Sequence, residues 1–431
     1  MDRRKRQTIL FLGMALFTMF FGAGNLLLPA FLGLQTRTDW TATFSGFSLS
    51  AILAPFLAIF AVTLSGNYFT DLGTRANVKL AYALSLVNVL CVGPLIALPR
   101  SGASVYEVAI KPLFPDAQPV WICVLFFGVV MVLSFSMDRI AGLLGKLFGP
   151  ILLILLAILI IPSVFSGETV AMPSTLIDDR FYVGFHEGYQ TMDVLAGLIF
   201  AGLLISGAKH KGYTHVNDRV EVVVKAAILA AGCMLLVYGS LFYLGAHANV
   251  MVSDVNRSNL LVDMAMQYFG HAGIYLISML MILACLTTAI ALTAGSANFL
   301  DRITKGKLGY IEGVISITLV SIILAITGVD PIIDYTAGLL NFIYPVTLVL
   351  VLLVLLFGGT IKNQKPYFIT LIVTMLISFI SVLIKWFPDE AVFQQIFDAL
   401  PLSRYNLEWV LPATLTFVIC CFALGRNLNK K

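Results

Sequence analysis

Long apolar segments recur along the whole chain, and they restrict the possible folds more than any other feature of the sequence. Each segment holds roughly 18–25 residues, enough for one helix to cross a hydrocarbon core about 30 Å thick. The connections between them are short and polar, so residues 1–431 are predicted to form a single all-α, polytopic membrane domain with about twelve transmembrane helices. The predicted spans lie near residues 8–32, 41–64, 79–99, 119–137, 145–165, 189–208, 226–246, 271–300, 310–327, 335–358, 366–385 and 408–425.

The composition excludes a soluble protein. Hydrophobic residues make up 59% of the chain and charged residues only 12%, whereas soluble domains carry about 25% charged residues. A surface that faces water needs more polar groups than this chain contains, so its partner is predicted to be the lipid bilayer. The basic residues are scattered among short loops, which argues against binding to nucleic acid.

Lysine and arginine are distributed unevenly between the two predicted sides of the membrane. With the N-terminus inside, the inner segments contain 20 of the 27 Lys and Arg residues and the outer loops contain 7. Arg100 is one of the seven in this count, because the third span is predicted to end at residue 99. Positive charge is enriched on the cytoplasmic side of membrane proteins, so both termini are predicted to be cytoplasmic.

The first predicted span contains helix-breaking residues near its middle, in the stretch FFGAGNLLLP at residues 20–29. Gly22 and Gly24 permit unusual backbone angles and the close approach of a ligand. Asn25 suits the cap of a second half-helix, and Pro29 suits its first turns. Such a break either binds a ligand, as in secondary transporters, or allows close helix packing through small residues.

Four stretches of the sequence resemble bacterial branched-chain amino acid:cation symporters. They are LFTMFFGAGNLLLPAFLGLQ in the first span, VGPLIALPR at 92–100, GFHEGYQTMDVLAGLIF at 184–200 and ACLTTAIALTAGSANF at 284–299. This resemblance implies the amino acid–polyamine–organocation superfamily, with its leucine-transporter-type architecture, in the cytoplasmic (inner) membrane of a bacterium.

The resemblance also implies a 5+5 inverted repeat in which helices 1 and 6 are broken. Spans 1–5 would form the first repeat over residues 8–165, and spans 6–10 the second over residues 189–358. Spans 11 and 12 would follow over residues 366–425.

The same resemblance implies where the substrate binds. Ala23 and Gly24 match positions whose amides hold a substrate carboxylate. Residues 192–197 match the unwound part of span 6, where carbonyls accept from the ammonium group. Met192 and Leu195 are expected to line an aliphatic pocket. The predicted substrate-binding set is Gly22, Ala23, Gly24, Asn25, Thr191, Met192, Asp193, Leu195 and Gly197.

Asp193 is a carboxylate within an apolar segment. A charged side chain at membrane depth is energetically unfavourable and marks a functional site by default. Asp193 also lies only a few residues inside its predicted span, where it could instead cap a half-helix. Both readings remain open from the sequence.

Span 8 contains a candidate cation site. Ala284, Thr287 and Thr288 are three and four residues apart, so they share one helical face. By resemblance to the sodium site of the superfamily, a carbonyl and two hydroxyls from this face would bind Na⁺ together with carbonyls of Thr18 and Phe21. Alternatively, each threonine hydroxyl bonds back to a carbonyl of its own helix.

These observations predict a secondary active transporter. It would carry leucine, isoleucine and valine into the cell together with Na⁺ and would need no cofactor. Proton coupling on the same fold is the alternative, although proton-driven relatives often carry a lysine in span 5, where this chain has only Lys146 at the cytoplasmic edge. The sequence contains no GxxxxGK[ST], HExxH or GxSxG motif, which argues against an ATP-driven pump and against an enzyme.

Overall fold

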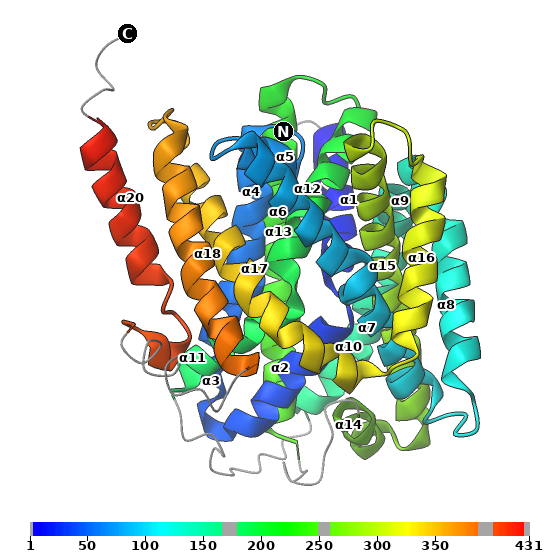
Figure 1. Cartoon of the computed structure of the whole chain (residues 1–431). Helices are drawn as coiled ribbons and strands as arrows, with labels where there is room; N and C mark the ends of the chain where they lie inside the picture. The colour runs from blue at the N-terminus through cyan, green and yellow to red at the C-terminus, as the bar shows by residue number, and fades with distance from the viewer. Residues whose placement is uncertain (1–2, 166–178, 249–258, 387–399, 426–431) are drawn as a thin grey trace.

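The computed structural model describes residues 3–165, 179–248, 259–386 and 400–425, and these residues form helices and turns without any strand (Figure 1). The α-helices are α1 (Arg3–Phe20), α2 (Ala23–Thr36), α3 (Trp40–Ser48), α4 (Ala54–Ser65), α5 (Phe69–Gly73), α6 (Val78–Leu90), α7 (Ala97–Ser104), α8 (Pro119–Ser134), α9 (Met137–Leu143), α10 (Gly149–Phe165), α11 (Arg180–Glu187), α12 (Asp193–His210), α13 (Val216–Ala246), α14 (Leu260–Phe269), α15 (His271–Ile303), α16 (Tyr310–Ala325), α17 (Val329–Phe357), α18 (Gln364–Trp386) and α20 (Val410–Gly425).

Short segments of other helical types join several of these helices. The π-helical segments are η2 (Leu49–Leu53), η3 (Cys91–Leu95), η4 (Val105–Ile110) and η5 (Leu144–Phe148). The 3₁₀ segments are η1 (Arg37–Asp39), η6 (Gly188–Thr191) and η8 (Ser403–Tyr405). Segments of this kind often mark hinges and functional positions in long helices, and two of them, η3 and η6, border the site described below.

The described residues include eight helical stretches that are long and apolar enough to cross a membrane. Three shorter apolar helices, α8, α16 and most of α20, accompany them. Large apolar side chains such as Trp121, Leu236 and Phe422 are exposed on the outside, which suits a surface that faces hydrocarbon rather than water. The chain is thus a multi-pass membrane protein, and the total of twelve spans stays a prediction.

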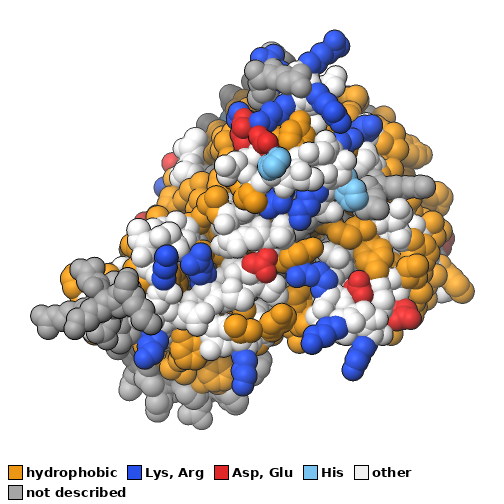
Figure 2. Space-filling model, turned by 90° about the horizontal axis from the view of Figure 1, so that it is seen from above, with side chains coloured by type: hydrophobic (Ala, Val, Ile, Leu, Met, Phe, Trp, Pro, Cys, Tyr) orange, Lys and Arg blue, Asp and Glu red, His pale blue; other side chains and the backbone are white. Residues whose placement is uncertain are grey.

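Basic side chains gather at the end of the bundle that holds the N-terminus (Figure 2). Contacts tie the predicted inner segments together at this end. Lys5 Nζ lies 2.7 Å from a carboxylate oxygen of Glu221, and Lys211 Nζ lies 4.9 Å from the centre of the Phe11 ring. Residues 426–431, which are predicted to lie on the same side, fall outside the described residues.

The two helices predicted to be broken lie in the interior of the bundle (Figure 1). The first, made of α1 and α2, packs along α13 and also contacts α15. The second, made of α11, η6 and α12, packs against α3 and α4. The last helices, α18 and α20, follow α17 at one edge of the molecule.

Glycines allow α2 and α13 to meet backbone to backbone. A Cβ at Gly33 would overlap the carbonyl of Phe242, and a Cβ at Gly245 would overlap the carbonyl of Ala30. Small residues at such crossings let membrane helices approach closely, where dispersion and weak Cα–H···O contacts stabilise the pair.

The crossing of α3 and α11 repeats this arrangement. A Cβ at Gly46 would overlap the carbonyl of Phe181, and a Cβ at Gly184 would overlap the carbonyl of Thr43. In predicted span numbers, span 1 packs on span 7 and span 6 packs on span 2. An internal repeat that relates span 1 to span 6 would produce this exchange of partners, and the 5+5 repeat itself stays a prediction.

Gly245→Ala is expected to lower the thermal stability of the purified protein in detergent. The added methyl group separates α2 from α13, and overpacking of this kind typically destabilises by about 1–3 kcal/mol. Gly232→Ala on the same helix is the matched control, because no atom lies within 4 Å of its added carbon. Equal melting temperatures for the two variants would contradict the close crossing.

Candidate functional site

The first predicted span breaks at Phe21 and Gly22, as the sequence predicts. Helix α1 ends at Phe20, and the amide of Gly22 donates to the carbonyl of Phe20 at 2.9 Å instead of to the carbonyl of Thr18, four residues back. The carbonyl of Thr18 therefore lacks the hydrogen bond that an unbroken helix would give it from the amide four residues later. Helix α2 begins at Ala23, with Gly22 in an extended conformation as its N-cap.

The sixth predicted span breaks just before α12. The 3₁₀ segment η6 ends at Thr191, and Met192 adopts a left-handed conformation with φ of 60° and ψ of 15°. This conformation is unfavourable by roughly 1–2 kcal/mol for a residue other than glycine, so the surrounding contacts must hold it. The break separates α11 from α12 (Figure 1), so the first half of the broken helix lies before residue 189, where the span was predicted to begin.

The predicted extent of this second break is wrong. Residues 192–197 are expected to be unwound, yet only Met192 is, and Asp193 begins a regular helix. Gly197 is a packing residue, since a Cβ there would lie 2.9 Å from the carbonyl of Pro55. Leu195 is in regular helix as well, and its carbonyl accepts from Asn88 Nδ2 at 3.1 Å.

A buried polar network joins the two breaks. Asn25 Nδ2 donates to a carboxylate oxygen of Asp193 at 2.6 Å and also hydrogen-bonds the hydroxyl of Tyr238 on α13. Asp193 and Asn25 are each only 3% exposed. The network connects three helices that are far apart in the sequence, and it gives a buried carboxylate the partners that burial requires.

Neither capping role predicted from the sequence is observed. Asn25 is the third residue of α2 and makes no cap, because its amide is engaged by Asp193. Asp193 is the first residue of α12 and does not cap it, and its own amide donates to the hydroxyl of Thr191 at 3.4 Å. Of the two readings of Asp193, the geometry therefore supports the one that places it in the site.

Arg100 lies beside this network, and the sequence analysis misplaced it in an outer loop. It belongs to α7 and is 7% exposed. Its Nη1 donates to the carbonyl of Gln190 at 2.7 Å. A Cβ at Gly24 would lie 2.7 Å from its Nη2, so only glycine lets the guanidinium rest on α2. The available signal was an arginine joined directly to the apolar run VGPLIALP.

The two breaks enclose a small cavity. Its volume is about 40 Å³, room for roughly three water molecules, so an amino acid enters only if the walls move apart. Arg100, Asp193 and Thr288 bring the polar groups of three helices to its surface. Of the predicted substrate-binding residues, seven line it: Gly22, Ala23, Gly24, Asn25, Thr191, Met192 and Asp193.

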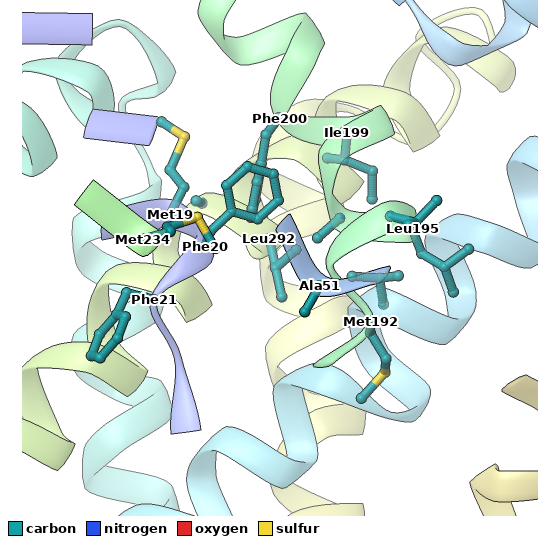
Figure 3. Packing of buried hydrophobic residues seen from close by; sticks show 14 of the residues in the cluster. Met19, Phe20, Phe21, Ala51, Met192, Leu195, Ile199, Phe200, Met234 and Leu292 are labelled. Atoms are coloured by element: carbon teal, nitrogen blue, oxygen red, sulfur yellow. The ribbon is translucent and has the colours of Figure 1, made fainter. Parts of the chain in front are cut away.

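Apolar side chains form the remaining wall of the cavity. Met19, Phe20, Val92 and Leu292 line it together with the predicted Met192. In Figure 3, Phe20 lies against Phe200, with ring centroids 5.2 Å apart.

The predicted aliphatic contact from Leu195 is wrong. Leu195 points away from Phe20 and Leu292 in Figure 3 and does not line the cavity. The next residue of the helix, Ala196, lines the cavity instead.

The candidate cation ligands of α15 behave differently from one another. Thr287 Oγ1 donates to the carbonyl of Ala284 at 3.0 Å, the back-bond that a structural threonine makes. Thr288 Oγ1 is buried without a hydrogen-bond partner among the described residues, and Thr288 lines the cavity. A Cβ at Gly22 would lie 3.1 Å from this oxygen, so Thr288 meets the break in the first span.

The two candidate ligands on the first span lie outside the cavity lining. The hydroxyl of Thr18 bonds back to the carbonyl of Ala15 at 2.8 Å, and Phe21 directs its ring towards Phe17 and Tyr238. The prediction concerned the backbone carbonyls of Thr18 and Phe21 and not their side chains. The carbonyl of Thr18 does not accept from the amide of Gly22, so it is the one that suits the predicted cation site.

Comparisons with known proteins agree with these features. The model of the family described as branched-chain amino acid transport protein matches residues 5–427. A protein of Staphylococcus saprophyticus that is named as a branched-chain amino acid carrier is 31% identical, over 95% of this chain and 94% of its own. A carrier of the same name from Staphylococcus aureus is 29% identical, over 96% of both chains.

Solved transporters share the fold. The nucleobase-cation-symport-1 family transporter Mhp1, in a closed conformation, superposes with a TM-score of 0.65 at 14% identity, covering 97% of this chain and 92% of its own. MhsT in complex with L-phenylalanine gives 0.58 at 15% identity, covering 96% and 98%. This similarity shows the leucine-transporter-type fold that the sequence predicts.

Asn25→Leu is expected to lower the thermal stability of the purified protein. The change keeps the side-chain volume but leaves a buried carboxylate and a buried hydroxyl without their donor, a loss of about 1–3 kcal/mol for each unsatisfied group. Thr63→Val is the control, because Thr63 is also buried but bonds only to the carbonyl of Ile59 on its own helix. A melting temperature for Asn25→Leu equal to that of the control would show that the network does not hold the breaks.

Proposed function

The chain belongs to the family of branched-chain amino acid transport proteins, and from this premise we propose that it is a sodium-coupled symporter of leucine, isoleucine and valine. It is a membrane transporter rather than an enzyme, since its family and the solved proteins that share its fold are membrane transporters. The proposal concerns the identity of the substrate, the coupling ion and the direction of transport, which is into the cell.

One observation carries the proposal: two helix breaks meet at a cavity that is lined by both charged or polar groups and apolar side chains. Breaks at membrane depth are stable only where protein or ligand takes up the freed backbone groups. An α-amino acid combines a charged backbone with a side chain of variable polarity. The polar lining groups suit the charged backbone, and the apolar lining groups suit the side chain.

The apolar wall favours branched aliphatic side chains. Met19, Phe20, Met192 and Leu292 provide methyl, methylene and aromatic surface. Burial of a leucine or isoleucine side chain there is worth about 1.5–3 kcal/mol. A charged side chain would enter the same wall without a partner, which is unfavourable by several kcal/mol.

Thr288 and the break in the first span support sodium as the coupling ion. Unwound carbonyls of broken helices coordinate Na⁺ in transporters of this kind. The hydroxyl of Thr288, the released carbonyl of Thr18 and the carbonyl of Ala284 are the oxygens that would bind it. Thr287 contributes less in this arrangement, because its hydroxyl already donates to Ala284.

A proton is the alternative coupling ion, and the buried carboxylate of Asp193 is the observation that favours it. Buried carboxylates serve as proton carriers in transporters. The lysine expected in proton-driven relatives is not near Thr288, because Lys146 lies over the ring of Phe11. Phe11 precedes Thr18 by seven residues of helix, or about 10 Å. Lys146 is therefore distant from the proposed cation site, which Thr18 and Thr288 share.

Alternating access needs a barrier on each side of the cavity. On the side of α11, Tyr189 stacks on Tyr344 with ring centroids 3.8 Å apart. Towards the N-terminal end of the bundle, the guanidinium carbon of Arg302 lies 3.1 Å from the centre of the Tyr68 ring. The basic N-terminal end is proposed to face the cytoplasm, so Arg302 and Tyr68 would part to release the substrate.

Isoleucine and valine are expected to inhibit uptake of labelled leucine into proteoliposomes, and equimolar lysine or glutamate is expected to leave it unchanged. The reason is the apolar wall, which offers no partner to a charged side chain. Strong inhibition by lysine would contradict the proposed substrate class.

Thr288→Val is expected to raise the sodium concentration needed for half-maximal leucine uptake. The change keeps the shape of the side chain and removes one oxygen, and an unsatisfied buried partner is worth about 1–3 kcal/mol, or roughly 5- to 150-fold in affinity. Thr287→Val is expected to have a smaller effect, because its hydroxyl is engaged within the helix.

Thr293→Val is the matched control for this titration. Thr293 lies on the same helix and its hydroxyl is also buried without a partner among the described residues, but it does not line the cavity. A sodium curve for Thr288→Val that overlays the curve for Thr293→Val would remove Thr288 from the cation site. Uptake driven equally well by a proton gradient without sodium would favour the alternative.

A further inference from the structure

Two opposite charges face the same small cavity from different helices. Arg100 extends from α7, and Asp193 begins α12. Both side chains are buried, and both line the cavity between the breaks. A ligand that carries both a negative and a positive charge would therefore meet an opposite charge for each in this one cavity.

Each of the two charged side chains is held in place by hydrogen bonds to its neighbours. Nη1 of Arg100 donates to the carbonyl of Gln190, in the segment that leads into the second break. The carboxylate of Asp193 accepts from Asn25, which hydrogen-bonds Tyr238. A side chain fixed in this way does not have to give up conformational freedom when a ligand arrives.

We propose that Arg100 binds the carboxylate of the transported amino acid and that Asp193 binds its ammonium group. The inference rests on the proposed function, because it names the groups that recognise the amino acid at the same cavity. It assigns to Arg100 the role that the sequence analysis gave to the amides of Ala23 and Gly24. The amides at the N-terminus of α2 would then assist a charge that the guanidinium holds.

The chemistry of the two groups fits these roles. A guanidinium matches the planar geometry of a carboxylate and can bind it through two parallel hydrogen bonds. Its Nη2 lies over Gly24, at the N-terminal end of α2, where the helix dipole also favours an anion. The carboxylate of Asp193, at the first residue of α12, can accept hydrogen bonds from an ammonium group, which acts only as a donor.

The position of Arg100 also explains the glycine at position 24. Any side chain there would meet the guanidinium and move it. The break sequence GAGN therefore accommodates an arginine from another span in addition to exposing its own backbone. Recognition of the amino acid backbone would in this way depend on α2, α7 and α12 together.

The test compares ligands that lack one charge at a time. Binding of leucine, of leucinol (no carboxylate) and of 4-methylpentanoate (no ammonium group) is measured on the purified full-length protein in detergent with sodium present. In Arg100→Gln, the preference for leucine over leucinol is expected to fall by roughly 10- to 150-fold, the range for a hydrogen bond to a charged group. The preference for leucine over 4-methylpentanoate should change little.

Asp193→Asn is expected to give the opposite pattern. Its preference for leucine over 4-methylpentanoate should fall, and its preference over leucinol should remain. If Arg100 only supports the fold through Gln190 and Gly24, its substitution lowers the affinity for all three ligands by the same factor. That result overturns the proposal. Arg37→Gln is the matched control, because Arg37 is also buried and donates to a backbone carbonyl, that of Ala248, away from the cavity.

Arg100→Lys keeps the test decisive if Arg100→Gln does not fold. Lysine retains the charge but not the paired donors, so the preference over leucinol is expected to fall severalfold while the protein remains stable. A parent protein that binds no branched-chain amino acid contradicts the proposed function. The same ratios are then measured with whichever of the twenty amino acids the parent binds, and binding of none overturns both proposals.

Discussion

A backbone that breaks inside a bilayer must find partners for its N–H and C=O groups within the protein, and the rest of this structure depends on how two breaks meet that requirement. The two breaks border one cavity, and hydrogen bonds connect the segments around them. Asn25, from the first break, donates to Asp193 at the second. Arg100, which rests on the first break, donates to the carbonyl of Gln190 near the second. These hydrogen bonds hold the segments at the two breaks against each other.

This mutual support has a consequence for transport. Asn25, Asp193 and Arg100 connect the segments around the breaks and also line the cavity. A ligand that enters the cavity therefore either displaces their present hydrogen bonds or adds to them. The cavity is too small for an amino acid as it stands, and Met192 is held in a left-handed conformation. Binding would therefore be coupled to movement of α12 against α2. Such coupling is what a symporter needs, since an empty carrier and a loaded carrier must differ in the state they favour.

The sequence predicted the local parts of this site and missed the contacts between distant segments. The glycines of GAGN and the depth of Asp193 are readable from residue type and spacing, and both features lie where they were predicted. The second break was predicted too long, because the resemblance implied an unwound segment over residues 192–197, whereas Gly197 lies in regular helix and allows close packing on Pro55. Tyr238 was missed because its role arises from the tertiary fold. Arg100 was missed because the third span was predicted to end at residue 99, although an arginine directly after an apolar run was a signal. Resemblance to a family supplied the architecture, and only the structure brought the opposite charges together.

The most direct test of the account is a structure of the protein determined with leucine and sodium bound. The account predicts that leucine lies between Gly24 and Asp193, with its side chain against Phe20 and Leu292. It also predicts that the cavity is wider than the 40 Å³ seen here. Leucine bound elsewhere, for example in the outer depression lined by Tyr182 and His186, with the two breaks unchanged, would contradict it.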